Sequence, residues 1–203
     1  RVEILEKPDE KMAALEKLAT IYVSRLELAH EATDIWGRVL EIDPSHRKAQ
    51  AELKRNLLAQ KDWDGLEAFF RSWGNPAEWV RTLESQDRAA ETAEERLSLL
   101  RRAALLWHEE LGDERRAVKN LELILEEASD DGDTADALIP LYRKLKAWKK
   151  LPAVYGVALR HAATPALRRP ILMALAEAQD VHLRDPSAAL DTHILALREE
   201  PGV

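Results

Sequence analysis

The chain has 203 residues and a formal net charge of −7, and 33% of its residues are charged while only 5% are aromatic. The acidic balance argues against nucleic acid as the main ligand, because a protein that neutralises phosphates needs a basic face. The absence of cysteine excludes a disulfide framework and thiolate metal sites, and no apolar run is long enough to span a bilayer. The few glycines and abundant helix formers favour an all-α protein without membrane insertion.

Helical periodicity and turn residues predict eleven helices in chain order. They are expected at 9–28, 30–42, 46–60, 62–73, 76–90, 92–111, 113–128, 134–146, 148–161, 165–183 and 186–199. Turns are expected at Asp43-Pro44, Gly112-Asp113, Asp131-Gly132-Asp133 and Asp185-Pro186. Pro152 suits a first helical turn, whereas Pro140 and Pro170 should kink or shorten their helices because proline removes a backbone donor.

The sequence repeats itself at two fixed offsets. The long offset pairs Tyr22 with Trp107, Leu26 with Leu111, Ala32 with Ala117, Trp36 with Leu121, Val39 with Ile124, Trp63 with Trp148 and Phe70 with Tyr155. The short offset then pairs Ala117, Leu121 and Ile124 with Ala189, His193 and Ala196. Because the short offset equals two helical hairpins of about 36 residues each, the hairpin is the elementary unit, and it must stack on neighbours to bury its apolar face.

The long offset exceeds the short one, and the additional residues fall between Trp73 and Leu100. There Asn75-Pro76 has the pattern of an N-cap followed by a first-turn proline, which predicts an extra helix. The expected organisation is two hairpins over 1–73, an extra helix or bend over 74–90 and three hairpins over 91–203, in one continuous solenoid.

Two segments resemble the tetratricopeptide repeat. One is Leu18-Ala19-x-x-Tyr22 followed by Ala32, Trp36, Val39 and Asp43-Pro44, and the other is Trp107-x3-Leu111-Gly-Asp-x3-Ala117. The resemblance implies an all-α, right-handed superhelix of hairpins with about eleven helices. The packing positions expected from it are Tyr22, Ala32, Trp36, Trp107, Ala117, Trp148, Tyr155 and Ala189.

Several positions depart from that family pattern. Lys54 and Ile139 replace its small residue, and Gln179 and His193 replace aromatic ones, so the half-a-tetratricopeptide family is a close alternative. The first residue is Arg1 and arginine outnumbers lysine by 19 to 11, which favours a fragment of a larger bacterial protein.

Chemical sites are not indicated by the remaining motifs. None of the six histidines stands at a zinc-type spacing, and His108-Glu109 lacks the second histidine of a metalloprotease helix because Gly112 takes that place. The acidic stretch 126–133 fits a turn between repeats better than a calcium loop. The tryptophans are expected to pack in the core, with Trp73 and Trp79 the most exposed. We therefore expect no catalytic residue, no metal and no cofactor.

In the resembled family the first helix of each hairpin lines a concave surface that receives a peptide. Carried over to this sequence, the resemblance predicts a partner groove formed by Lys48, Glu52, Arg55, Arg101, Arg102, His108, Arg143 and Lys144. Further inward positions are Glu16, Lys17, Thr20, Leu105, Met173, Glu177 and Asp180. The alternative interpretation is that these charges form solvated helix faces.

The sequence thus predicts a non-catalytic scaffold that binds a protein or peptide, or assembles with itself. One alternative is an RNA-processing scaffold of the half-repeat type, and another is a regulatory or partner-binding region of a larger enzyme. The identity of the partner and the cellular compartment stay open, with the cytoplasm preferred.

Overall fold

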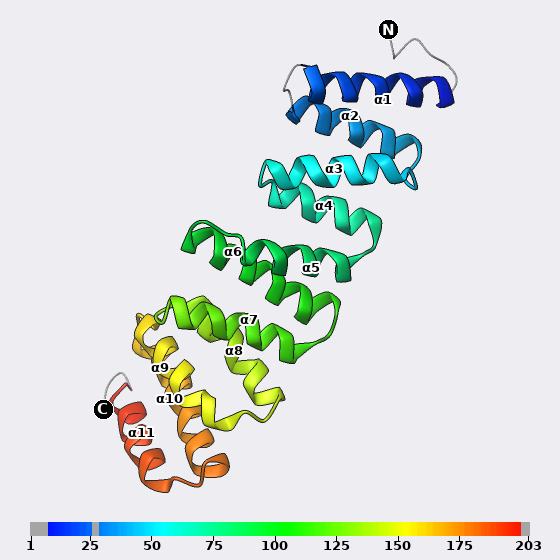
Figure 1. Ribbon diagram of the computed structural model, residues 1–203. Helices are drawn as coiled ribbons and strands as arrows, with labels where there is room; N and C mark the ends of the chain where they lie inside the picture. Colours follow the sequence, from blue (N-terminus) through cyan, green and yellow to red (C-terminus); the bar gives the residue numbers. More distant parts are fainter. Residues whose placement is uncertain (1–7, 26–28, 200–203) are drawn as a thin grey trace. The chain divides into compact units, whose positions relative to one another are not determined.

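The computed structural model describes residues 8–25 and 29–199, and this part of the chain is helical throughout, with short turns and no strand (Figure 1). Its eleven α-helices are α1 (Pro8–Arg25), α2 (Ala29–Ile42), α3 (Arg47–Ala59), α4 (Trp63–Trp73), α5 (Pro76–Asp87), α6 (Ala93–Leu105), α7 (Glu114–Glu127), α8 (Gly132–Lys144), α9 (Leu151–His161), α10 (Pro165–Glu177) and α11 (Pro186–Arg198). The predicted all-α class and the eleven helices are confirmed.

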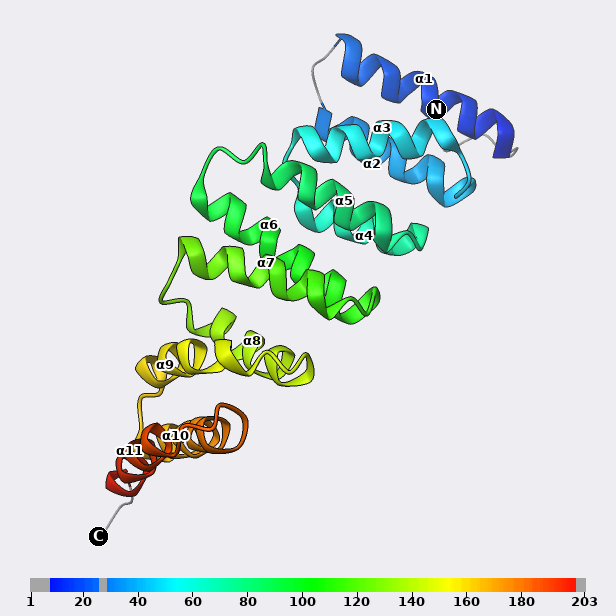
Figure 2. The same cartoon turned by 60° about the horizontal axis from the view of Figure 1, so that its bottom comes forward.

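The chain divides into two compact units, one ending at Trp79 and the other beginning at Val80, so that the division falls inside α5. We call them unit 1 and unit 2. In unit 1, α1 packs on α2, α2 on α3, and α3 on α4. In unit 2 the same succession runs from α6 to α11, each helix packing on the next (Figure 2). Each unit is therefore an array of antiparallel helical hairpins.

The helix boundaries differ from the prediction at a few places. The predicted end of the first helix and the repeat position Leu26 lie outside the described residues. The helices expected over 92–111 and 165–183 each end in a π-helical turn, Leu106–Glu110 and Ala178–His182. Neither Pro140 nor Pro170 shortens its helix, because α8 and α10 continue on both sides of them.

The repeat recurs in the details of the helix ends. At the short offset, Thr92 and Thr164 both cap a first helix, and Asp113 and Asp185 both cap a second one. The two π-helical turns are separated by the same short offset. At the long offset, the matching features are the N-caps His46 and Asp131 and the positive φ angles of Lys61 and Lys146. The duplicated sequence thus forms duplicated local structure.

Small residues allow the two helices of a hairpin to approach closely. Ala32 and Ala117, which are equivalent, are both fully buried. Of the other predicted packing positions, Trp36, Trp107, Tyr155 and Ala189 are buried, while Tyr22 and Trp148 are half-buried. Trp148 lies in a 3-10 turn and stacks on His182, with ring centroids 3.6 Å apart.

Asn75 and the aromatic residues around it define the start of α5. The Glu78 amide donates to Asn75 Oδ1 at 3.1 Å, which confirms the predicted N-cap. Trp73 is exposed as predicted (40%), but the prediction for Trp79 was wrong, since it is 2% exposed. It stacks on Phe70 at 5.2 Å between ring centroids, a tertiary contact that spacing along the chain does not reveal.

A ladder of side-chain bonds links nearby helices within each unit. The bonded pairs include Glu16 with His46 and Lys48, Arg96 with Glu127, Arg101 with Asp131, Glu114 with Lys144, Glu122 with Lys150 and Asp130 with Arg160. The two members of each pair lie between 28 and 32 residues apart. These bonds therefore span somewhat less than one hairpin along the sequence.

Candidate functional site: a groove between α6 and α8

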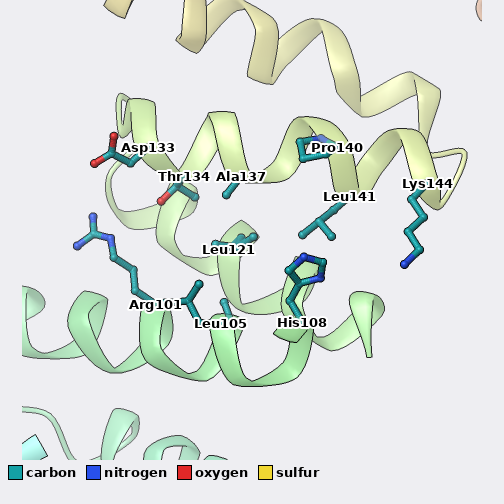
Figure 3. A pocket seen from close by; sticks show the side chains of 11 residues that line it. Arg101, Leu105, His108, Leu121, Asp133, Thr134, Ala137, Pro140, Leu141 and Lys144 are labelled. Atoms are coloured by element: carbon teal, nitrogen blue, oxygen red, sulfur yellow. The ribbon is translucent and has the colours of Figure 1, made fainter. Parts of the chain in front are cut away.

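A pocket of about 380 Å³ lies between the first helices of two successive hairpins in unit 2 (Figure 3). We call it the first-helix groove. Its walls come from α6 and α8, and Leu121 of α7 lies between them at the base. The full lining is Arg101, Ala104, Leu105, His108, Leu121, Asp133, Thr134, Ala137, Pro140, Leu141 and Lys144. The centre is apolar, and the charged residues lie at the two ends.

Helix periodicity places these residues on one face. In α8 the lining positions 133, 137, 140 and 144 follow the spacing of a single helix stripe. On α6, Arg101 and Leu105 are one turn apart, and the following π-helical turn carries His108. Because a π-helical turn contains an extra residue, it changes the direction of the side chains that follow it. In this way His108 reaches the groove opposite Leu141 (Figure 3).

Small side chains keep the groove open. Ala104 and Ala137 contribute only methyl groups, and Pro140 adds a compact ring without a polar head. Leu105 is 56% exposed although it belongs to this apolar surface. An exposed leucine beside an apolar cavity is a feature of binding surfaces, where a ligand removes it from water.

Ion pairs fix both ends of the groove. Arg101 pairs with Asp131, the N-cap residue of α8, and Lys144 pairs with Glu114 at the start of α7. Burial alone would raise the pKa of Asp131, but hydrogen bonds with Thr134 and the Arg101 pair hold it below its ordinary range. The Lys144 ammonium similarly lowers the pKa of Glu114, with a smaller contribution from His108. Both carboxylates are thus stabilised in the charged form.

The structure brings three of the predicted groove residues together: Arg101, His108 and Lys144 line the pocket. Arg102 is half-buried on α6 outside it. Arg143 lies against Trp148 and Tyr155 in a much smaller cavity of about 10 Å³.

The other three predicted groove residues belong to α3 in unit 1. Lys48 bonds to Glu16 at 3.0 Å, and Glu52 pairs with Arg55 on the same helix. These side chains are engaged with neighbouring charges in their own unit.

Sequence reasoning placed Leu105 among the inward positions but missed the rest of the apolar lining. The resemblance directed attention to charged inward positions, whereas Ala137, Pro140 and Leu141 read as ordinary helix residues. One signal was present in the repeat: at the long offset, Ala137 and Pro140 take the places of Glu52 and Arg55. Because two long charged side chains are replaced by small ones, this face of α8 is less charged and less bulky than the equivalent face of α3.

The groove lining contains one carboxylate, Asp133 in the first turn of α8, and no serine beside His108. Among the described residues, no group of three or more His, Asp and Glu side chains is arranged to hold a metal ion. None of the described helices is long and apolar enough to cross a membrane.

Comparison with known proteins found similar solved structures but no matching family model. No curated protein matches the chain. A solved structure from a study of pilF of Pseudomonas aeruginosa is 19% identical, with a TM-score of 0.43, and the match covers 97% of this chain and 95% of that one. The resemblance to tetratricopeptide repeats rests on the hairpins and repeat positions of this chain itself.

Proposed function

We propose that the chain is a non-catalytic scaffold that binds a protein partner, and that the first-helix groove of unit 2 receives a segment of that partner. The observation that carries this proposal is the open apolar groove between α6 and α8, with the exposed side chain of Leu105 on its wall. Stacked hairpins expose such surfaces repeatedly, and a partner gains affinity by covering apolar area.

The charges at the groove ends favour a particular segment chemistry. Arg101 and Lys144 each pair with one carboxylate but keep about half or more of their side-chain surface exposed. A guanidinium has five N–H donors and an ammonium has three, so each can also donate hydrogen bonds to a second carboxylate. We infer that the segment carries a bulky apolar side chain for the centre and an acidic residue beside it, in either an extended or a helical conformation.

The experiment is a selection of peptides from a displayed random library on the full chain, with Leu105→Glu as the test variant. Leu167→Glu is a matched control, because Leu167 is equally exposed (56%) and does not line the groove. We expect the selected peptides to bind the Leu105→Glu variant at least about tenfold more weakly, since a central apolar anchor commonly contributes about 1.4 kcal/mol or more. The control should bind within about twofold of the unchanged protein.

Two results would overturn the proposal. One is a set of selected peptides whose affinity does not depend on Leu105 or on Lys144→Glu. The other is binding of single-stranded RNA that weakens steeply with salt and that competes with the peptides, which would favour the half-repeat RNA scaffold.

A further inference from the structure

A second groove lies in unit 1, on the opposite set of helices. It has a volume of about 1100 Å³ and is formed by the second helices α2 and α4, with Leu53 and Leu57 of α3 on its floor. We call it the second-helix groove. Phe69 and the exposed Trp73 complete its apolar surface on α4. Its residues are separate from those of the groove between α6 and α8.

Two glycines line this groove, and each stands where unit 2 has a charged side chain. At the long offset, Gly37 corresponds to Glu122 and Gly65 to Lys150. In unit 2, Lys150 Nζ donates to Glu122 at 2.6 Å, and the Tyr142 hydroxyl donates to the same carboxylate at 2.7 Å. The bridge that spans the second helices in unit 2 is therefore missing in unit 1, because both of its members are glycine.

Packing does not account for Gly37. A Cβ atom added there would meet no heavy atom within 4 Å, and glycine inside a helix is destabilising relative to alanine. Gly65 differs, because a Cβ atom there would meet Asp62 and Leu57 at less than 3 Å. Because position 37 is glycine, no side chain projects into the groove from this point of the α2 wall.

The charges along the groove are mainly negative. Carboxylates of Asp34, Glu41 and Asp62 line it, against the single guanidinium of Arg38, which is already engaged. Asp62 is the N-cap of α4. Within the described part of the chain, Asp34 and Glu41 form no ion pair, and both are exposed on the α2 wall. A cationic partner would therefore find two free carboxylates beside an apolar floor.

We propose that the second-helix groove binds a basic amphipathic helix of a partner protein. The apolar face of that helix lies on Leu53, Leu57 and Phe69, its lysine or arginine side chains face Asp34 and Glu41, and Trp73 covers its end. The 14 residues of α2 give the wall a length of about 21 Å, which suits three to four turns of a bound helix. Helix-in-groove binding of this kind uses anchors at positions i, i+3, i+4 and i+7.

The test uses two labelled helical peptides of the same length as α2 and with the same leucine face, one flanked by lysines and the other by glutamates. Their binding to the full chain is measured by fluorescence anisotropy. We expect the lysine peptide to bind, and the glutamate peptide to bind at least about tenfold more weakly. Reversing the carboxylates (Asp34→Lys with Glu41→Lys) should weaken the lysine peptide by about three- to tenfold. The control is Glu126→Lys with Asp191→Lys, two exposed acidic residues outside the groove.

A second part of the experiment fills the second-helix groove with a larger side chain. Gly37→Leu places a side chain in open space, so we expect the fold to persist and the lysine peptide to bind at least about tenfold more weakly. Gly156→Leu is the matched control, because Gly156 also lies inside a helix with nothing within 4 Å of an added Cβ. Should circular dichroism show that Gly37→Leu does not fold, Ala68→Leu on the opposite wall takes its place.

Three results would overturn this proposal. The lysine peptide could fail to bind the unchanged protein, or it could bind the Gly37→Leu and Gly156→Leu variants equally well. The third is a monomer–dimer equilibrium, seen by sedimentation, that Gly37→Leu abolishes, which would make the occupant a second copy of this chain. The Leu105→Glu variant should bind the lysine peptide normally, so failure here is distinguishable from failure at the groove between α6 and α8.

Discussion

The two units have equivalent helix faces but differ in which face is open. In unit 1 the first helices α1 and α3 are joined by Glu16, which bonds to His46 at 3.1 Å and to Lys48 at 3.0 Å, and the groove lies between the second helices. In unit 2 the groove lies between the first helices, and Glu122 and Lys150 bridge the second ones. The two grooves therefore lie on different faces of their hairpins, although in unit 2 Arg101 and Asp131 also join α6 to the start of α8 at one end of the groove.

The linings of the two grooves differ at a few repeat positions. The ion-paired Glu52 and Arg55 of α3 correspond to Ala137 and Pro140 of α8. On the second helices, Gly37 corresponds to Glu122. At these positions the groove linings therefore carry small residues where the other unit carries long charged ones.

The largest effect is expected from breaking one unit at a time. Ala117→Arg in unit 2 and Ala32→Arg in unit 1 each force a charged side chain into a fully buried position. We expect either change to cost more than about 4 kcal/mol, because the charge has no partner in close helix packing. Thermal melting by circular dichroism and amide hydrogen exchange measure the loss.

Peptide binding shows whether the two grooves are independent. Ala117→Arg should abolish binding at the groove between α6 and α8 and leave the groove between α2 and α4 functional, and Ala32→Arg should do the reverse. A wild-type melting temperature for either variant would contradict the assigned repeat alignment.

An intermediate effect is expected from transferring the charged pair of unit 1 into unit 2. The double variant Ala137→Glu with Pro140→Arg places an i, i+3 ion pair across the first-helix groove, as Glu52 and Arg55 form in α3. Affinity for the selected peptides should fall by about tenfold or more, since the apolar surface is covered. Stability should stay equal or rise, because the change removes a proline from the interior of α8.

The reverse exchange serves as the comparison. Glu52→Ala with Arg55→Ala removes a surface ion pair in which Arg55 is exposed and Glu52 half-buried, so its effect on the free energy of unfolding should be within about 0.5 kcal/mol. Unchanged peptide affinity in the Ala137→Glu, Pro140→Arg variant would show that these two positions do not determine the open groove.

The smallest expected effect is a loss of thermal stability at acidic pH. The pKa values of Asp131 and Glu114 lie below their ordinary values of 3.8 and 4.5 in the folded protein. A carboxylate with a lowered folded pKa stabilises the fold above its unfolded pKa and loses this contribution as the pH falls through the folded value. We therefore expect the melting temperature to fall modestly as the pH drops below about 4.

A variant without the two cations isolates this contribution. In Arg101→Gln with Lys144→Gln, each carboxylate loses a cation that lowers its pKa, while the hydrogen bonds from Thr134 to Asp131 remain. The difference in melting temperature between this variant and the unchanged protein should shrink in acid. A difference that is constant from neutral pH into acid would show that the two ion pairs contribute nothing to stability.

Most of the fold could be predicted from the sequence because helix periodicity and repeat positions are local signals. Ala32 and Ala117 were identified from their spacing alone, and both are fully buried. The π-helical turns were not predicted, because one extra residue disturbs the periodicity only slightly. The burial of Trp79 was missed, since it depends on stacking against Phe70 on another helix.

The candidate site was predictable only in part. Arg101, His108 and Lys144 came from their inward positions in the resembled repeat, and the structure places them around one pocket. Apart from Leu105, the apolar lining was not predicted, because small residues such as Ala137 give no signal until the equivalent residues of the other unit are compared. Gly37 likewise gives no signal in the sequence until it is compared with Glu122, the equivalent residue of unit 2.

The ladder of ion pairs has a consequence for how the chain folds. Its members lie 28 to 32 residues apart, so each bond closes a loop no longer than about one hairpin. The entropy cost of closing a loop rises with its length, and chains dominated by short-range contacts fold quickly. Neighbouring hairpins can therefore form and dock in succession as the chain leaves the ribosome, and no electrostatic contact of the ladder has to wait for a distant part of the sequence.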